Sequence, residues 1–460
     1  MLFYTLMKPV AQLALRIFFH RLEVRHRERL QLPGPLLIAA NHPNTLMDPL
    51  VVAIHRRDPV AFLAKSTFFQ NPVLRRIMTS GNSIPIYRRQ DVDANSTVTP
   101  AELARRNEAA FSRSYDYLDQ GGTVMIFPEG TSISERRLRP LKTGAARIAL
   151  GAEARHNFQL GLHILPVGIN YFDPTRFRSD VLVNIAPPIV VANYAAAYQQ
   201  DPEAAADALT EEIRLRLERR LVITRDAAED RLVQQVEDTF TNHLIADDEE
   251  TLYDNFQLSR TLLEAVAFFE KHDPDQLQQV RSQLTTYLLH LDRLRLTDAA
   301  LEPSSKEGRL ARALRTLLKL TLGAPVWLYG LINNYIPYIL PSLVAKRATN
   351  DVAFVAPIML VVGMLTFPLS YAAQTVLVQH LTHDWRWTTL YTLSLPFAGF
   401  YALSYWNSLE ARVRRLRAWH LFRQQRPVAE NLFQQRAAIL RLLDEARTAY
   451  LKATSDVISR

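Results

Sequence analysis

The sequence of 460 residues has no cysteine and only 14 glycines. Without cysteine, the chain cannot have a disulfide framework, a thiol nucleophile, an iron–sulfur cluster or a cysteine zinc site. The scarcity of glycine indicates a helix-rich chain with few tight hairpins. Apolar residues make up 48% of the chain and charged residues 22%, which excludes wholesale disorder. The formal net charge of +8 suits phosphate-bearing partners or an anionic membrane surface as well as nucleic acid.

Charged residues are missing from long stretches of the C-terminal half. No Asp, Glu, Lys or Arg occurs at 320–345, 352–383 or 387–409. About 20 apolar residues cross a bilayer as a helix, so transmembrane helices are expected at about 352–379 and 387–407. Lys346 and Arg347 precede the first helix and an arginine cluster follows the second, so the positive-inside rule places both outer ends in the cytoplasm. A pair of buried core helices is the alternative interpretation.

Two further apolar segments are expected to contact a membrane without crossing it. The stretch 320–345 has basic residues on both sides, so it is interpreted as an interfacial or re-entrant segment. At the N-terminus, 1–29 begins with apolar residues at helical spacing, interrupted by Lys8 and Arg16, and it lacks the cleavage site of a signal peptide. An interfacial amphipathic helix is expected there, with a helix docked on the next domain as the alternative.

Residues 30–195 alternate β-branched runs with helical patterns. Strands are expected at 35–40, 83–87, 123–127, 163–169 and 180–186. Thr99, Pro100 and Glu102 form a capping box with proline at the first helical position. The alternation predicts an α/β domain with a mostly parallel sheet flanked by helices. The expected order of the later segments is a charged helical region at 196–318, a membrane region at 319–410 and basic cytoplasmic C-terminal helices at 411–460.

Four short segments lie where expected strands end, which is where open α/β sheets bind ligands. In the first segment, His42 is followed by Asp48. A carboxylate can fix the imidazole tautomer and favour the imidazolium that forms when the ring accepts a proton. In the second segment, Arg88 and Arg89 follow an apolar strand, and their planar guanidinium groups suit phosphate oxygens. Each segment by itself is more often structural than functional.

The third and fourth segments carry a glycine turn and a proline. Phe-Pro-Glu-Gly-Thr-Ser at 127–132 delivers Glu129 and Gly130 to a strand end, where a ligand can approach the backbone. The fourth segment, 164–171, contains Pro166 and by itself reads as a core or edge strand.

Taken together and in this order, the four segments resemble the glycerolipid acyltransferase superfamily. This group contains bacterial lysophosphatidate and glycerol-3-phosphate acyltransferases, and the resemblance covers 30–190. The common first motif has four residues between His and Asp, whereas five intervene between His42 and Asp48. This spacing, with Pro49 following, looks like the branch containing the fungal glycerol-3-phosphate/dihydroxyacetone-phosphate acyltransferases. That branch also has C-terminal membrane segments.

The resemblance implies a role for each matching residue. His42 would be the general base, oriented by Asp48, and these two form the catalytic pair. The substrate phosphate and glycerol would be held by Arg88, Arg89, Glu129 and Gly130. Candidate donor or supporting contacts are Asn41, Thr131, Lys142 and Pro166. The expected reaction transfers a fatty acyl group from acyl-CoA or acyl carrier protein to a hydroxyl of glycerol-3-phosphate, with lysophosphatidate as the alternative acceptor.

The expected setting is an integral membrane protein whose active site faces the cytoplasm, at the inner membrane if the source is bacterial. Membrane lipid is an expected partner, while nucleic acid, a metal and a cofactor are not, since no recognition motif or metal-ligand pattern is visible in the sequence. The competing hypothesis is a non-catalytic, membrane-anchored lipid-binding scaffold. It predicts binding of lysolipid without consumption of an acyl thioester.

Overall fold

The computed structural model describes residues 2–87, 99–244, 251–298, 301 and 309–458. The chain divides into two compact units. The first contains Met1–Ile223 and Pro341–Met364, and the second contains Thr224–Leu340 and Leu365–Arg460. Each unit is described by itself below.

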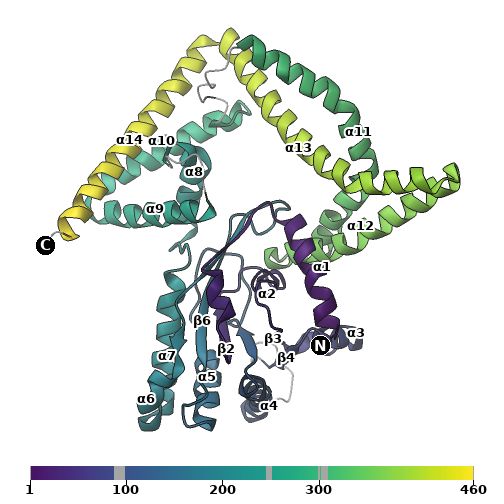
Figure 1. Cartoon of the computed structure of the whole chain (residues 1–460). Coiled ribbons are helices and arrows are strands. Elements are labelled where there is room, and N and C mark those ends of the chain that lie inside the picture. The colour runs from purple at the N-terminus through teal and green to yellow at the C-terminus, as the bar shows by residue number, and fades with distance from the viewer. Residues whose placement is uncertain (1, 88–98, 245–250, 299–300, 302–308, 459–460) are drawn as a thin grey trace. The chain divides into compact units, whose positions relative to one another are not determined.

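The first unit is built on an eight-stranded sheet (Figure 1). Its strands are β1 (Leu22–Arg25), β2 (Leu36–Ala40), β3 (Val60–Lys65), β4 (Ser83–Ile86), β5 (Thr123–Ile126), β6 (His163–Tyr171), β7 (Val181–Ile185) and β8 (Ile189–Val190). The strand order is β1-β7-β6-β2-β5-β3-β4, and β8 pairs with β6. The pairings of β6 with β7 and with β8 are antiparallel, and the other pairings are parallel. The predicted α/β domain with a mostly parallel sheet is therefore confirmed.

Helices cover both faces of this sheet. They are α1 (Leu2–Phe18), α2 (Met47–Ala53), α3 (Pro72–Ser80), α4 (Pro100–Asp119), α5 (Gly144–Arg155), α6 (Ala195–Gln200) and α7 (Pro202–Glu218), with 3₁₀ turns η1 (Arg27–Gln31), η2 (Ser66–Phe69) and η4 (Val191–Tyr194). Alternate side chains of β2 enter different cores. Leu37 belongs to the core with α4, α5 and α7, and Ile38 to the core with α1 and α2. Burial on both faces explains why the central strands are apolar without alternation.

Details of the first unit differ from the sequence expectations. The unit continues to Ile223, beyond the expected boundary at 195, because Leu209 and Ile213 of α7 pack into the sheet core. The N-terminal helix α1 is docked on the sheet through Leu15 and Phe18, while its other face exposes apolar side chains. Those exposed side chains are Phe3, Leu6, Val10, Leu13 and Ile17. The docked-helix alternative therefore describes one face of α1, and the amphipathic interpretation describes the other.

In the second unit, α8 (Ala227–Leu244), α9 (Leu252–His272), α10 (Pro274–Arg293) and α14 (Arg426–Ile458) pack around a core to which Ala418, near the end of the long helix 385–424, also contributes. Tyr287 and Leu432 are among the buried core side chains. Arg436 of α14 binds the buried Asp298 through two nitrogens at 2.8 and 3.0 Å. Side-chain packing and this ion pair thus connect the C-terminal helix with the charged region before the long apolar helices.

Three long helices account for the apolar C-terminal stretches: α11 (Arg309–Ala348), α12 (Val352–Thr382) and α13 (Trp385–Gln424). Among the described helices, α12 is the one long and apolar enough to cross a membrane. The expected crossing at 387–407 falls within α13, which does not meet that criterion, so this second crossing stays a prediction. The stretch 320–345 is helical throughout as part of α11.

Candidate functional site

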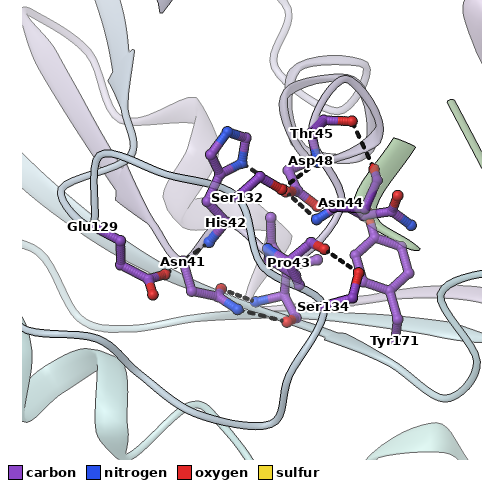
Figure 2. A network of polar contacts seen from close by, with 12 residues as sticks. Asn41, His42, Pro43, Asn44, Thr45, Asp48, Glu129, Ser132, Ser134 and Tyr171 are labelled. Carbon is purple, nitrogen blue, oxygen red and sulfur yellow. Dashed lines mark hydrogen bonds and ion pairs between the residues drawn. The ribbon is translucent and has the colours of Figure 1, made fainter. Parts of the chain in front are cut away.

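Loops that follow neighbouring strands meet at one edge of the sheet. Strand β2 lies between β5 and β6 and runs parallel to both, so the carboxyl ends of the three strands share that edge. The segment after β2, the segment after β5 and the end of β6 are adjacent there (Figure 2). Three of the four predicted segments therefore form one site. Arg88 and Arg89 lie outside the described residues, so their predicted contact with phosphate stays a prediction.

His42 and Asp48 form a directly hydrogen-bonded pair in this site. His42 lies in the loop after β2, and Asp48 lies in the first turn of α2. Their Nδ1 and Oδ2 atoms are 2.8 Å apart. An ionised carboxylate accepts hydrogen bonds only, so the imidazole carries its proton on Nδ1, and Nε2 is left to accept one. No described residue hydrogen-bonds to Nε2. The five-residue spacing is thus compatible with a functional dyad.

The two members of this pair differ in their access to solvent. The His42 side chain is 19% exposed, whereas that of Asp48 is fully buried. Burial raises the pKa of Asp48, while hydrogen bonds from His42, the Asn44 backbone and Tyr171 oppose this effect. The His42 ring stacks on Phe127, with ring centres 3.9 Å apart. Phe127 thus restrains one face of the ring, and the carboxylate fixes its rotation.

Glu129 holds the backbone of the loop that carries His42. Its Oε1 accepts a hydrogen bond from the His42 N–H at 2.9 Å, and its Oε2 accepts one from the Arg139 N–H at 3.1 Å. Burial raises the pKa of Glu129, and these two backbone donors partly compensate. Both carboxylate oxygens therefore have protein partners, and Glu129 positions the His42 backbone, while its predicted contact with the glycerol phosphate stays a prediction.

Hydroxyl side chains add further bonds between the two loops. Ser132 Oγ accepts from the Thr45 N–H at 2.9 Å, and Ser134 Oγ donates to the Pro43 carbonyl at 2.7 Å. The Ile133 N–H donates to the His42 carbonyl at 3.0 Å. The Phe-Pro-Glu-Gly-Thr-Ser element and the residues after it are thus bound to the segment after β2. This network restricts the movement of the His42 backbone relative to β5.

Gly130 and Lys142 lie together beside this network. Gly130 has φ +73°, a left-handed conformation that side-chain-bearing residues rarely adopt, and a Cβ at this position would lie 2.6 Å from Lys142 Nζ. Lys142 precedes α5 and is exposed, and no described residue forms a hydrogen bond or ion pair with its ammonium group. The structure therefore places a cation directly over the glycine turn, where the sequence predicted a phosphate or donor contact.

The remaining predicted residues have structural positions near the pair. Both side-chain groups of Asn41 hydrogen-bond to the Ile169 backbone, at 2.7 and 2.9 Å, and extend the pairing of β2 with β6. Thr131 is half-buried in the turn after Gly130. Pro166 is buried within β6, opposite Ala39 in the parallel register. The labelled network in Figure 2 thus includes Asn41 but neither Thr131 nor Pro166.

Sequence reasoning did not assign roles to Tyr171, Phe127 and Thr45. The hydroxyl group of Tyr171 donates to Asp48 Oδ1 at 2.9 Å, although the two residues are 123 positions apart. Thr45 has φ 34° and its hydroxyl donates to the Ala353 carbonyl at 2.8 Å, which links the loop to the first turn of α12. The sequence signal that could have found Phe127 and Tyr171 is their position at the end of a strand. Phe127 directly follows β5, and Tyr171 is the last residue of β6.

No group of three or more His, Cys, Asp or Glu side chains suited to a metal ion occurs among the residues that the structure describes. The carboxylate and imidazole groups of the site belong to a buried aspartate, a buried glutamate and a partly exposed histidine. The chemistry available to this arrangement is general base catalysis, in which Nε2 of His42 removes a proton from a bound hydroxyl or water.

Comparisons with known proteins agree with the motif resemblance. The family model described as "Acyltransferase" matches residues 21–170. Glycerol-3-phosphate O-acyltransferases 1 and 2 of Saccharomyces cerevisiae are 37% and 35% identical over 101 and 108 residues. These matches cover 22% and 23% of this chain, but only 13% and 14% of the yeast proteins.

A solved structure gives a longer match at lower identity. The crystal structure of the 1-acyl-sn-glycerophosphate acyltransferase of Thermotoga maritima matches 45% of this chain and 79% of that chain, with 19% identity and a TM-score of 0.29. The comparisons therefore show that residues 21–170 match the acyltransferase family model and that part of this chain is similar to part of the yeast glycerol-3-phosphate O-acyltransferases.

Proposed function

We propose that the chain is an O-acyltransferase that moves a fatty acyl group from acyl-CoA or acyl carrier protein to a hydroxyl of glycerol-3-phosphate. The observation that supports this most is the hydrogen bond between His42 Nδ1 and the buried Asp48, at the sheet edge where the acyltransferase-family motifs meet. The relatives named as glycerol-3-phosphate O-acyltransferases suggest the acceptor. Phosphatidic acid and phospholipid biosynthesis is the corresponding metabolic setting.

In the proposed reaction, His42 Nε2 takes the proton of the acceptor hydroxyl as its oxygen attacks the thioester carbonyl carbon. The imidazolium that forms is stabilised by the Asp48 carboxylate. Collapse of the tetrahedral intermediate breaks the C–S bond, and the leaving thiolate takes the proton from the imidazolium. One ester replaces one thioester, the thiol is released and His42 returns to its neutral form. No covalent acyl-enzyme and no metal are needed in this scheme.

The proposed acceptor carries a phosphate, and three basic residues are candidates to bind it. Arg88 and Arg89 are assigned from the sequence, and Lys142 from its position over Gly130. A guanidinium or ammonium group pairs with a phosphate through charge-assisted hydrogen bonds. Lysophosphatidate presents the same phosphate, so acylation of 1-acylglycerol-3-phosphate is the alternative activity. A non-catalytic, membrane-anchored lipid-binding scaffold is the more remote alternative.

An acyl-transfer assay separates these functions. Membranes from an expressing host are supplied with radiolabelled acyl-CoA, or acyl carrier protein, and with glycerol-3-phosphate, dihydroxyacetone phosphate or lysophosphatidate in turn. We expect the label to appear in acylated glycerol-3-phosphate, above the level of membranes from a host without the gene. Preferential labelling of phosphatidate from lysophosphatidate would support the alternative acceptor. Binding of lysolipid with no label transferred would instead support the scaffold.

We also propose that the chain is an integral membrane protein with the active site at the cytoplasmic face. Exposed apolar side chains run along α12, among them Leu365, Leu369 and Val376. The contacts between the long helices of the second unit include hydrogen bonds between polar side chains. Tyr371 of α12 donates to Asn334 of α11 at 2.6 Å, and Tyr391 of α13 donates to Asn333 at 2.6 Å. Amide and hydroxyl groups between apolar helices are typical of helix packing in lipid.

The connection between Thr45 and Ala353 supports placing the chemistry near the bilayer surface. The proposed membrane helix α12 begins at Val352, and its first turn is hydrogen-bonded to the loop that carries the catalytic pair. Lys346 and Arg347 precede this helix and favour the cytoplasmic side for that end. An active site there can receive acyl chains from the lipid phase and a phosphorylated acceptor from water.

Charged substitutions on the exposed face of α12 test the membrane proposal. Wild-type chain is expected to remain in the membrane pellet after an alkaline carbonate wash. Leu365→Asp with Leu369→Asp is expected to reduce the pelleted fraction strongly, since each aspartate costs roughly 3 kcal/mol at the centre of a membrane helix. Leu289→Asp in α10, where the leucine is 51% exposed, is the matched control and should leave the pelleted fraction unchanged. Release of the wild-type chain by carbonate would contradict integral insertion.

A further inference from the structure

Tyr171 is a buried tyrosine that the mechanism above does not use. It is the last residue of β6 and is 9% exposed. Its hydroxyl group donates to Asp48 Oδ1 at 2.9 Å, and its ring packs against Phe19 with ring centres 5.9 Å apart. The ring is therefore held by the apolar core, and the hydroxyl points at the carboxylate that orients His42, as Figure 2 shows.

The Asp48 carboxylate divides its hydrogen bonds between its two oxygens. Oδ2 faces His42 Nδ1 at 2.8 Å and also accepts the Asn44 N–H at 2.7 Å. Oδ1 accepts a hydrogen bond from the Tyr171 hydroxyl group, and among the described residues this is the donor to that oxygen. Asp48 is fully buried, so water does not replace a missing donor. Loss of the Tyr171 hydroxyl would leave Oδ1 as a buried acceptor without a partner, which disfavours the ionised carboxylate.

The charges around Asp48 give this hydrogen bond its importance. The ionisable groups that face it are His42 from the loop after β2, Glu129 from the loop after β5 and Tyr171 from β6. Burial and the nearby Asp48 carboxylate raise the pKa of Tyr171 well above its usual value, so its hydroxyl remains a donor throughout the working pH range. Burial raises the pKa of Asp48, whereas the hydrogen bond from Tyr171 lowers it. This hydrogen bond therefore helps to keep Asp48 ionised beside a neutral His42.

We propose that Tyr171 is a positioning residue that fixes and stabilises the ionised Asp48 carboxylate, which in turn keeps His42 competent as a base. The proposal rests on the proposed function, because the base has a role only if acyl transfer occurs. Tyr171 does not touch the reacting atoms. It acts through Asp48, and the chain Tyr171–Asp48–His42 joins the end of β6 to the loop after β2.

The substitution Tyr171→Phe removes the hydroxyl group and keeps the ring that packs on Phe19. The active pair is a neutral imidazole with an ionised carboxylate. Loss of the hydroxyl donor destabilises this anionic state more than it destabilises the protonated pair. The apparent pKa of the pair therefore rises. We expect the acid limb of kcat/KM to move to higher pH by about one pH unit, so that activity on the acid side falls about tenfold. KM for the acceptor should change much less than kcat.

Tyr117→Phe is the matched control. Tyr117 also belongs to the sheet unit, and its hydroxyl donates to the Pro59 carbonyl at 3.2 Å and accepts from Asn82 at 3.0 Å. This substitution removes a tyrosine hydroxyl that is not bonded to the pair, so the pH profile should match that of the wild type. A Tyr171→Phe profile that keeps its wild-type acid limb, even with lower activity, would overturn the proposal and indicate a purely structural role.

A readout without turnover separates this inference from the proposed function. The full chain, labelled with ¹⁵N-histidine and held in detergent micelles, is titrated by NMR, with the His42 signals assigned from their loss in His42→Ala. In Tyr171→Phe, we expect the titration of the hydrogen-bonded pair, followed through these signals, to move to a higher pH than in the wild type. An unchanged titration would overturn the role of Tyr171. Absence of acyl transfer by the wild-type chain would refute the proposed function, while the titration still decides the role of Tyr171.

Discussion

Replacing His42 with alanine is expected to abolish acyl transfer while leaving expression and membrane association intact. A positioned general base raises the rate of such reactions by roughly 10²- to 10⁴-fold. Among the described residues, no second histidine hydrogen-bonds to Asp48 and could take over this role. The measurement is the rate of transfer from labelled acyl-CoA at saturating acceptor, with the amount of folded chain matched between samples. Retained turnover would refute the assignment of His42 as the base.

The exposed pair of His156 and Asp119 supplies a matched control for this experiment. Its Nε2 and Oδ1 atoms are 2.9 Å apart, a contact similar to that of His42 and Asp48, but its side chains are 42% and 27% exposed. His156→Ala should therefore leave acyl transfer unchanged. The comparison separates the chemical role of His42 from the general loss of a histidine–carboxylate contact. A comparable loss of activity in both variants would point to destabilisation instead of chemistry.

The second large effect is expected for Asp48→Asn. An asparagine amide that donates to Nδ1 favours the tautomer with the proton on Nε2, and that nitrogen then cannot accept the hydroxyl proton. The corresponding change in the catalytic triad of serine proteases lowers kcat by about 10⁴, and we expect a loss of roughly 10³ or more here. The measurement is kcat across the pH range, together with the thermal midpoint of the purified chain.

The pH range distinguishes this effect from that of Tyr171→Phe. An asparagine side chain does not ionise, so raising the pH should not restore activity in Asp48→Asn, whereas Tyr171→Phe should recover above its shifted acid limb. Asp119→Asn is the matched control and should behave like the wild type. Substantial activity in Asp48→Asn at any pH would show that the carboxylate does not orient the base.

The glutamate of the Phe-Pro-Glu-Gly-Thr-Ser element makes contacts that the sequence did not indicate. The resemblance implied that Glu129 helps to hold the glycerol phosphate. In the structure, its two oxygens accept the backbone N–H groups of His42 and Arg139. Glu129 therefore acts on the geometry of the pair, and the Lys142 ammonium group lies beside Gly130 of the same element.

The five strands expected from the sequence correspond to β2, β4, β5, β6 and β7, whereas β1, β3 and β8 were not expected. The expected strand at 123–127 corresponds to β5, and that at 180–186 to β7. Strand β1 was missed because Leu22–Arg25 has charged residues at two of its four positions. It pairs in parallel with β7, a partner far along the chain. A strand of this kind depends on tertiary pairing more than on local propensity.

The sequence by itself determined which residue types stand at the strand ends and their order. It also determined the α/β class, because alternating strand and helix patterns favour a parallel sheet, and it located the apolar stretch that forms α12. These properties depend on local periodicity and composition.

Only the tertiary structure decided which atoms meet. It joined Asp48 to Tyr171 across 123 positions, attached Thr45 to the start of α12 and used both oxygens of Glu129 on backbone groups. Contacts of this kind follow from the strand order β6-β2-β5, which brings the ends of distant segments together at one edge. Local sequence patterns do not encode that order, because strand pairing is set by the packing of the whole sheet and its covering helices.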